Sequence, residues 1–226
     1  MASRLRVFSS SVGTKVLIGA SGLFLVLYLV IHIAGNLLVF FGPRVFNAYA
    51  YTMEVRNPAL PLIELVLLAA FLVHIYKTVT MYLRNQRARP VRYEQKKRAG
   101  RPSRKTLASS TMIASGLWLV IFLLIHVKAF HDGWGTEYPW PGGGRDLYRQ
   151  EMETFRNPYM TVFYVLSMIV VGTHLSHGVA SGFQSLGADH PRWTPRVLLF
   201  GKALAVLIAG GFIVIALWAY VVGARP

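Results

Sequence analysis

The sequence predicts an all-α membrane protein in which a single domain, residues 1–226, contains five transmembrane helices. Three observations lead to this fold class. Hydrophobic residues make up 54% of the chain, and the mean hydropathy is positive at +0.45. The apolar residues form long runs rather than the amphipathic spacing of a helix on a soluble protein. The net charge of +15 comes from basic residues that cluster between these runs, as in membrane proteins.

Each of five apolar runs is long enough for a helix of about 20 residues, the length that crosses a bilayer. The runs lie at residues 13–41, 59–84, 106–130, 159–186 and 196–222. The first run follows Arg4, Arg6 and Lys15, as the apolar core of a signal peptide would, but such a core has only roughly 7–15 residues. We therefore expect the first run to be retained as a span.

The charges of the connections predict the orientation. Residues 84–105 contain ten Lys or Arg and one acidic residue, whereas residues 131–157 contain three Arg and five acidic residues. Because cytoplasmic loops of membrane proteins are enriched in Lys and Arg, we place residues 84–105 in the cytoplasm. The N-terminus is then cytoplasmic, and the connections 42–58 and 131–157 face outward. This distribution explains the basic charge without a nucleic-acid partner.

The chain has no cysteine, which excludes disulfides, iron–sulfur ligation, thiolate metal sites and covalently attached c-type haem. Any metal must be held by other side chains.

An internal repeat relates the first run to the third. Residues 20–26 (ASGLFLV) match residues 114–120 (ASGLWLV), and His32 and His126 each follow eleven residues after the serine of this motif. The repeat places Ser21 and Gly22 in positions equivalent to those of Ser115 and Gly116.

The second run is related to the fourth in the same way. The motif MEVRNP at residues 53–58 matches METFRNP at residues 152–158, and His74 and His174 each follow sixteen residues after the proline. Matched runs cross the membrane in the same direction, so the two halves should be related by a pseudo-twofold axis along the membrane normal.

Helical rise converts these spacings into two levels in the membrane. At ~1.5 Å per residue, His74 and His174 lie ~24 Å inward from the Asn-Pro corners, whereas His32 and His126 lie ~9–15 Å from the outer ends of their spans. The sequence thus predicts an inner pair, His74 with His174, and an outer pair, His32 with His126.

Two histidines at each level are what two b-type haems require. Ionisable side chains inside a bilayer persist mainly where they have a partner, and each histidine alone could simply bond a neighbouring helix. A b haem takes two axial imidazoles from opposite sides, which facing helices of a four-helix bundle can supply. We expect the first four spans to form this di-haem bundle, with Gly22 and Gly116 leaving space beside the porphyrins.

The histidines and the five spans resemble one known family. His32 followed by Asn36, then His74, His126 and the run from His174 to Gly178, is similar to the single-chain, di-haem cytochrome b subunit of succinate:quinone oxidoreductases and fumarate reductases. The resemblance covers nearly the whole chain. It implies a subunit of the bacterial cytoplasmic membrane that passes electrons from succinate through the two haems to a membrane quinone, with menaquinone as the expected type.

The resemblance also implies partners. A flavoprotein with FAD and an iron–sulfur protein would dock on the cytoplasmic face, and the complex could assemble further into a higher oligomer. The chain would therefore be part of an enzyme without acting on succinate itself. Some fumarate-reductase relatives carry a glutamate two residues before the ligand in the fourth span, where this sequence has Gly172, so a compensating proton path of that type is not expected.

Several other polar residues are candidates for the quinone or the haems. Glu64 is the acidic residue inside a predicted span, and it can either exchange protons with a quinone or form a structural hydrogen bond. Ser21, Ser115, Lys15 and Lys77 could meet haem propionates or a quinone carbonyl, although lysines near span ends commonly extend to the interface. His177 is the second choice for the fourth-span ligand. We expect His131 and His190 to be solvated.

Two alternatives remain open from the sequence. The chain could be the di-haem cytochrome of another quinone-linked enzyme, such as a hydrogenase, formate dehydrogenase or nitrate reductase. It could also be a haem-free transporter, in which the repeat and Glu64 would form a substrate path.

Overall fold

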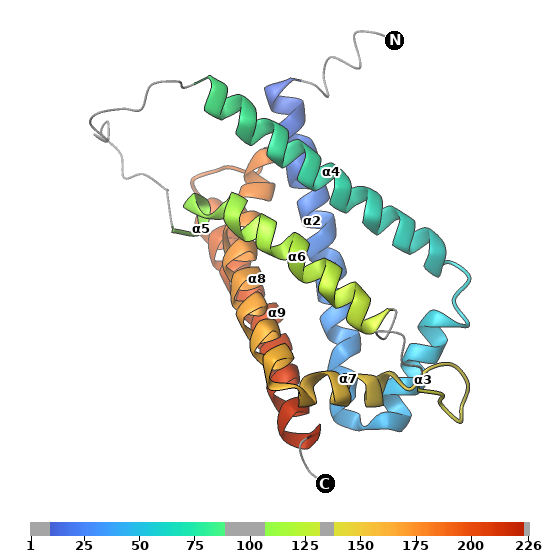
Figure 1. The fold of residues 1–226 in the computed structure, drawn as a ribbon. Helices are drawn as coiled ribbons and strands as arrows, with labels where there is room; N and C mark the ends of the chain where they lie inside the picture. The colour runs from blue at the N-terminus through green and yellow to red at the C-terminus, as the bar shows by residue number, and fades with distance from the viewer. Residues whose placement is uncertain (1–9, 89–106, 132–137, 224–226) are drawn as a thin grey trace.

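The computed structural model describes residues 10–88, 107–131 and 138–223, and it is all-α over these ranges (Figure 1). Five helical segments are long and apolar enough to cross a membrane. They are Ser11–Phe41, Leu60–Arg87, Met112–Phe130, Pro158–Ser185 and Thr194–Gly223. The predicted fold class is therefore confirmed, and most span boundaries differ from the prediction by only a few residues.

The first span consists of two elements that follow each other without a gap. Helix α2, Ser11–Asn36, begins at Ser10, whose side chain accepts a hydrogen bond from the Gly13 backbone. The 3-10 helix η1, Leu37–Phe41, continues it and ends at Gly42, where φ is 87°. Because such a φ favours glycine, Gly42 fixes the end of this span.

The third span differs most from the prediction. A continuous helix was expected over residues 106–130, but the structure has a short helix α5, Leu107–Ser110, and then α6, Met112–Phe130. The break falls at Thr111, whose hydroxyl and backbone nitrogen both bond the Ala108 carbonyl. Side-chain bonds of this kind compete with the helical pattern, which explains the break.

Each connection at one end of the bundle contains a helix that hydropathy did not predict. Helix α3, Pro43–Glu54, starts with a proline in its first turn, and α7, Leu147–Arg156, is capped by the Asp146 side chain. Both lie across the ends of the spans in Figure 1, near the C-terminus. We call this the α3/α7 end.

The remaining spans are α4, Leu60–Arg87, α8, Pro158–Ser185, and α9, Thr194–Gly223. Helix α8 packs most extensively against α9, and α2 packs against both α4 and α8. Among the described helices, α4 packs extensively only against α2, and none of its residues is buried. The main core lies between α2, α8 and α9, where Ile33, Leu175 and Ile208 are buried.

Polar contacts fasten the α3/α7 end. The buried Asn47 side chain of α3 donates to Asp146 at 2.8 Å and accepts from the Tyr148 backbone at 2.9 Å. Arg145 pairs with Glu54 at 2.7 Å and also donates to the Phe130 carbonyl at the end of α6. Hydrogen bonds that involve a charged group contribute about 1.5–3 kcal/mol each to stability. This network therefore holds α3 and α7 against the ends of the spans.

Candidate functional site

Two serines hold the two histidines that the sequence predicts as the inner pair. His74 of α4 places its Nδ1 atom 3.3 Å from the Ser21 hydroxyl and 3.2 Å from the Ile18 carbonyl, both on α2. His174 of α8 places its Nδ1 atom 2.9 Å from the Ser115 hydroxyl of α6. Because Ser21 and Ser115 are equivalent in the repeat, the repeat in sequence produces a repeated contact in space.

The contacts of His74 indicate which of its ring nitrogens carries the proton. The Ile18 carbonyl, which can only accept a hydrogen bond, lies 3.2 Å from Nδ1 of His74, so Nδ1 donates and Nε2 keeps a free lone pair. The Ser21 hydroxyl donates to the Leu17 carbonyl at 2.6 Å and can accept from the same Nδ1 atom. Histidines that bind metals show this arrangement, in which the second ring nitrogen donates to the protein. For His174, the Ser115 hydroxyl lies within hydrogen-bond distance of both Nδ1 and the Met112 carbonyl.

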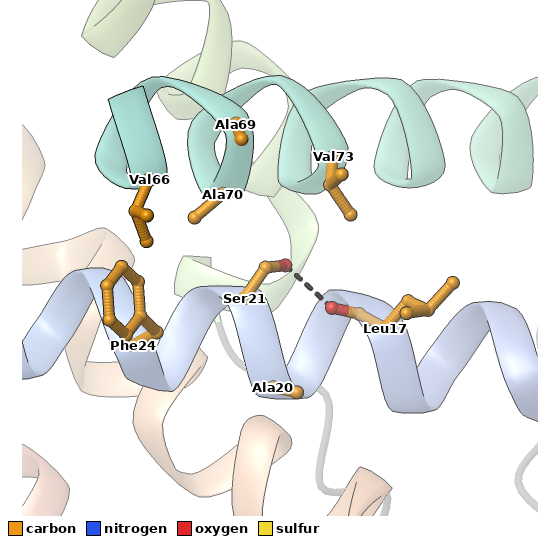
Figure 2. A pocket seen from close by; sticks show the side chains of 8 residues that line it. All are labelled: Leu17, Ala20, Ser21, Phe24, Val66, Ala69, Ala70 and Val73. Atoms are coloured by element: carbon orange, nitrogen blue, oxygen red, sulfur yellow. Dashed lines mark hydrogen bonds between the residues drawn. The ribbon is translucent and has the colours of Figure 1, made fainter. Parts of the chain in front are cut away.

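The serines were expected to meet haem propionates or a quinone carbonyl. In the structure both hydroxyls contact histidine rings, and these contacts can orient the rings. Figure 2 shows Ser21 pointing from α2 toward α4, with its hydroxyl bonded to the Leu17 carbonyl.

An apolar hollow of about 350 Å³ lies beside Ser21, between α2 and α4 (Figure 2). Its lining consists of Leu17, Ala20, Ser21, Phe24, Val66, Ala69, Ala70 and Val73. Three of these are alanines, and their short side chains leave room between the two helices. The hollow has the size and apolar character of a small ligand site.

The repeated glycines lie against the same histidines. A Cβ atom on Gly22 would be 3.0 Å from Cε1 of His74, whereas a Cβ atom on Gly116 would be 3.9 Å from Cε1 of His174. Gly22 thus permits the close approach of α4 to α2, while Gly116 leaves ordinary space. The two glycines therefore lie beside the rings of His74 and His174.

The two histidines of the predicted outer pair lie side by side. The ring centroids of His32 and His126 are 5.9 Å apart, and the ring planes are at 88°. A histidine nitrogen lies about 2 Å from a metal that it binds, so two imidazoles on opposite sides of one metal have ring centres roughly 6 Å apart. The separation therefore fits a shared metal.

Protein groups also approach Nδ1 of the outer pair. The Tyr164 hydroxyl of α8 lies 3.3 Å from Nδ1 of His126, and the Asn36 amide nitrogen lies 3.4 Å from Nδ1 of His32. In all four histidines the hydrogen-bonding neighbour thus approaches Nδ1. Within the described ranges, no hydrogen bond engages Nε2 of any of them.

Aromatic rings surround the outer pair. Tyr28 stacks on His32 at 5.3 Å and Phe122 stacks on His126 at 5.5 Å. Phe212 of α9 also contacts His32, with ring centroids 5.5 Å apart. The sequence analysis gave the fifth span no part in the site, so this contact is a finding of the structure.

The four histidines form two neighbouring pairs in the structure. His32 and His126 lie together, and His174 interacts electrostatically with His74. His177 is half-buried and forms no hydrogen bond in the described part of the chain, so the serine contact favours His174 as the ligand.

The residues present fit a haem. The Nε2 atoms of the paired histidines make no hydrogen bond within the described residues, so they can face a metal that has its own equatorial ligands. The Thr78 hydroxyl, one helical turn after His74, is a fully buried polar atom, and it has no hydrogen-bond partner among the described residues. It is available to a polar group of a ligand beside the inner pair.

Glu64 lies near the outer pair but on an exposed part of α4. It interacts electrostatically with Tyr28, which stacks on His32, and Tyr49 of α3 interacts with Tyr28 in the same way. The Tyr49 hydroxyl in turn packs closely against Gly35. Tyr28 and Tyr49 were missed by the sequence reasoning, because neither belongs to the repeat or carries charge.

The remaining candidates are two lysines and two histidines near helix ends. Lys15 is exposed, and the Lys77 ammonium lies 5.8 Å from the centre of the Tyr76 ring. His190 is exposed in the turn before α9, as expected. His131 is exposed at the end of α6, also as expected.

Comparison with known proteins gives no match, whether with family models, curated proteins or solved structures. The functional argument therefore depends on the geometry of the site.

Proposed function

We propose that this chain is the membrane-embedded cytochrome b subunit of a succinate:quinone oxidoreductase, with two b haems. His32 and His126 would hold one haem, and His74 and His174 the other. The observation that carries the proposal is the hydrogen bonding of the inner pair: Nδ1 of each ring meets the equivalent serine hydroxyl, and the Ile18 carbonyl leaves the Nε2 lone pair of His74 free. The 5.9 Å separation of the outer pair is independent support.

A haem held by two of these histidines would supply reversible one-electron transfer. The protein orients its ligands from neighbouring helices. Ser21 and Ser115 fix the rings of the inner pair, and Tyr164 and Asn36 approach those of the outer pair. The aromatic rings around the outer pair exclude water, which strengthens electrostatic interactions at the site.

We propose that a membrane quinone, with menaquinone as the expected type, binds beside Glu64, Tyr28 and Tyr49. Reduction of a quinone to a quinol takes up two electrons and two protons. A carboxylate near the outer pair can pass protons from the aqueous phase to the quinone oxygens. A tyrosine hydroxyl can donate a hydrogen bond to a quinone carbonyl and so position the ring.

The proposed partners are a flavoprotein with FAD and an iron–sulfur protein on the cytoplasmic side of a bacterial membrane. Basic residues support this placement: the last turn of α4 carries Arg84 and Arg87, at the end opposite to α3 and α7. The exposed apolar side chains of the spans are suited to contact with lipid.

The proposal is tested by purifying the chain from its native membrane under conditions that preserve complexes. We expect bound FAD and b haem that succinate reduces. Haem accompanied by nickel or molybdenum instead would support another quinone-linked respiratory enzyme, and a chain without haem would contradict the proposal.

The role of Glu64 is tested separately with Glu64→Gln, which removes the ionisation and keeps the shape. Loss of quinone reduction with both haems intact is the expected result. Full activity with normal haem content would show that Glu64 is a structural group.

A further inference from the structure

A buried carboxyl group at the α3/α7 end has no part in the function proposed above. Glu151 of α7 is 4% exposed, and no hydrogen bond or ion pair to its side chain is found within the described ranges. Glu153, two residues later, is exposed and lies 3.9 Å from Arg156. A buried charge without a partner is strongly disfavoured, so Glu151 holds a proton more tightly than an ordinary glutamate does.

The surroundings of Glu151 explain why its carboxyl group holds a proton. Burial raises the pKa of Glu151 to about 8, and no charged side chain contributes to this shift. Helices α3, α6, α8 and α9 pack against α7. At this end they carry Arg44, Tyr49, Tyr51 and Glu54 of α3, His126 and Lys128 of α6, Tyr159 and Tyr164 of α8, and Tyr220 of α9. Tyr164, together with Tyr148 on α7 itself, interacts electrostatically with Glu151.

Tyr164 connects Glu151 to the outer pair of histidines. Its ring is 5% exposed, and its hydroxyl lies 3.3 Å from Nδ1 of His126. The ring also contacts Phe155, one turn of α7 beyond Glu151, with centroids 5.0 Å apart. Tyr164 therefore interacts electrostatically with Glu151 and contacts His126 through its hydroxyl. The side chains around Tyr164 are apolar, and an apolar environment screens charges poorly.

We infer that Glu151 is the group that binds a proton when the haem held by His32 and His126 takes up an electron. The inference rests on the proposed function. One electron, from a quinol or an added reductant, reduces the iron, and one proton from the aqueous phase binds to the Glu151 carboxylate. The electron and the proton both leave when the haem is reoxidised. The added negative charge at the iron favours the neutral carboxylic acid, so electron and proton uptake are coupled.

The experiment is a redox titration of the outer haem in the purified holoprotein at several pH values. By linkage, a group that binds a proton on reduction makes the midpoint potential fall as pH rises. In the unmodified protein we expect this fall within about pH 6–9, around the raised pKa of Glu151. Glu151→Gln should remove the fall, whereas the matched control Glu153→Gln, a change at an exposed site on the same helix, should keep it.

An infrared difference spectrum gives a second readout that does not depend on activity. Reduction of the haem should increase the carboxylic acid C=O band, and this increase should be absent in Glu151→Gln. If Glu151→Gln does not fold, Glu151→Asp keeps an ionisable group, and its C=O band should appear at a different frequency. An unshifted band in Glu151→Asp, or a normal pH dependence in Glu151→Gln, would overturn the inference. A preparation without haem would instead contradict the proposed function itself.

Discussion

The substitution Gly22→Ala tests how the inner pair is built, and Gly116→Ala is its matched control in the second half of the repeat. At Gly22 the new Cβ atom would lie 3.0 Å from Cε1 of His74, which is closer than the 3.4–4 Å of ordinary contacts. At Gly116 the distance to Cε1 of His174 would be 3.9 Å. The same chemical change therefore has different consequences at two equivalent positions.

The expected magnitudes follow from two opposing effects. Replacing glycine with alanine inside a helix stabilises it by roughly 1 kcal/mol at either position. At Gly22, moving the His74 ring by a few tenths of an ångström adds a packing cost of roughly 1–3 kcal/mol. We therefore expect Gly116→Ala to be neutral or stabilising, and Gly22→Ala to be less stable than Gly116→Ala by about 1–3 kcal/mol.

The assay is thermal unfolding in detergent, followed by circular dichroism, together with the haem content of each variant. For a chain of this size 1 kcal/mol corresponds to roughly 2–4 °C in Tm. Movement of the His74 ring also lengthens its 3.3 Å contact with Ser21, so Gly22→Ala should lose haem from the inner pair while Gly116→Ala keeps it. Equal Tm values and equal haem contents in the two variants would refute the reasoning.

Three further predictions concern the α3/α7 end and the orientation. Arg145→Gln should lower the free energy of unfolding by about 1–3 kcal/mol, because it breaks the contacts with Glu54 and the end of α6. Arg44→Gln, at an exposed site on α3, should change it by under about 0.5 kcal/mol in the same thermal assay. The pKa of Glu151 is raised in the folded state from 4.5 to about 8. As the pH rises between these two values, the unfolded chain loses a proton that the folded chain keeps, so the free energy of unfolding falls. The fall is about 1.4 kcal/mol per pH unit, and Glu151→Gln should abolish it; a Tm with the same pH dependence in both proteins would contradict this. A cysteine at Ala88 should resist an impermeant reagent in intact cells and one at Gly142 should react; the reverse pattern would invert the predicted orientation.

The five spans could be predicted because hydropathy depends on composition alone. Runs such as residues 59–84 lack charged residues other than Glu64 and Lys77 until their last position. In lipid, a single apolar segment of this length satisfies its own backbone hydrogen bonds as an α-helix. The break at Thr111 could not be predicted in this way, since it depends on local hydrogen bonds rather than on hydropathy. The basic connection 84–105 lies mostly outside the described residues.

The repeat predicted which residues of the site belong together, but not which atoms meet. Equal spacing from Ser21 to His32 and from Ser115 to His126 indicated two equivalent halves. It could not show that each serine contacts the histidine of the neighbouring span, His74 or His174, because that contact depends on how α2 and α6 are rotated against their neighbours.

The contacts at the α3/α7 end lay beyond sequence reasoning for a different reason. Arg145 and Glu54 are 91 residues apart, and Asn47 and Asp146 are 99 apart. Neither pair belongs to a repeat or motif that would bring the partners together. Glu151 was likewise indistinguishable from Glu153 in the sequence, since only packing determines which of the two is buried.

The haem content of the purified chain and of its histidine variants tests the central claim most directly. We expect two b haems per polypeptide, with His74→Ala and His174→Ala losing one of them and His32→Ala and His126→Ala losing the other in reduced-minus-oxidised spectra. One haem or none in the unmodified chain, or a common loss in His74→Ala and His126→Ala, would contradict the account.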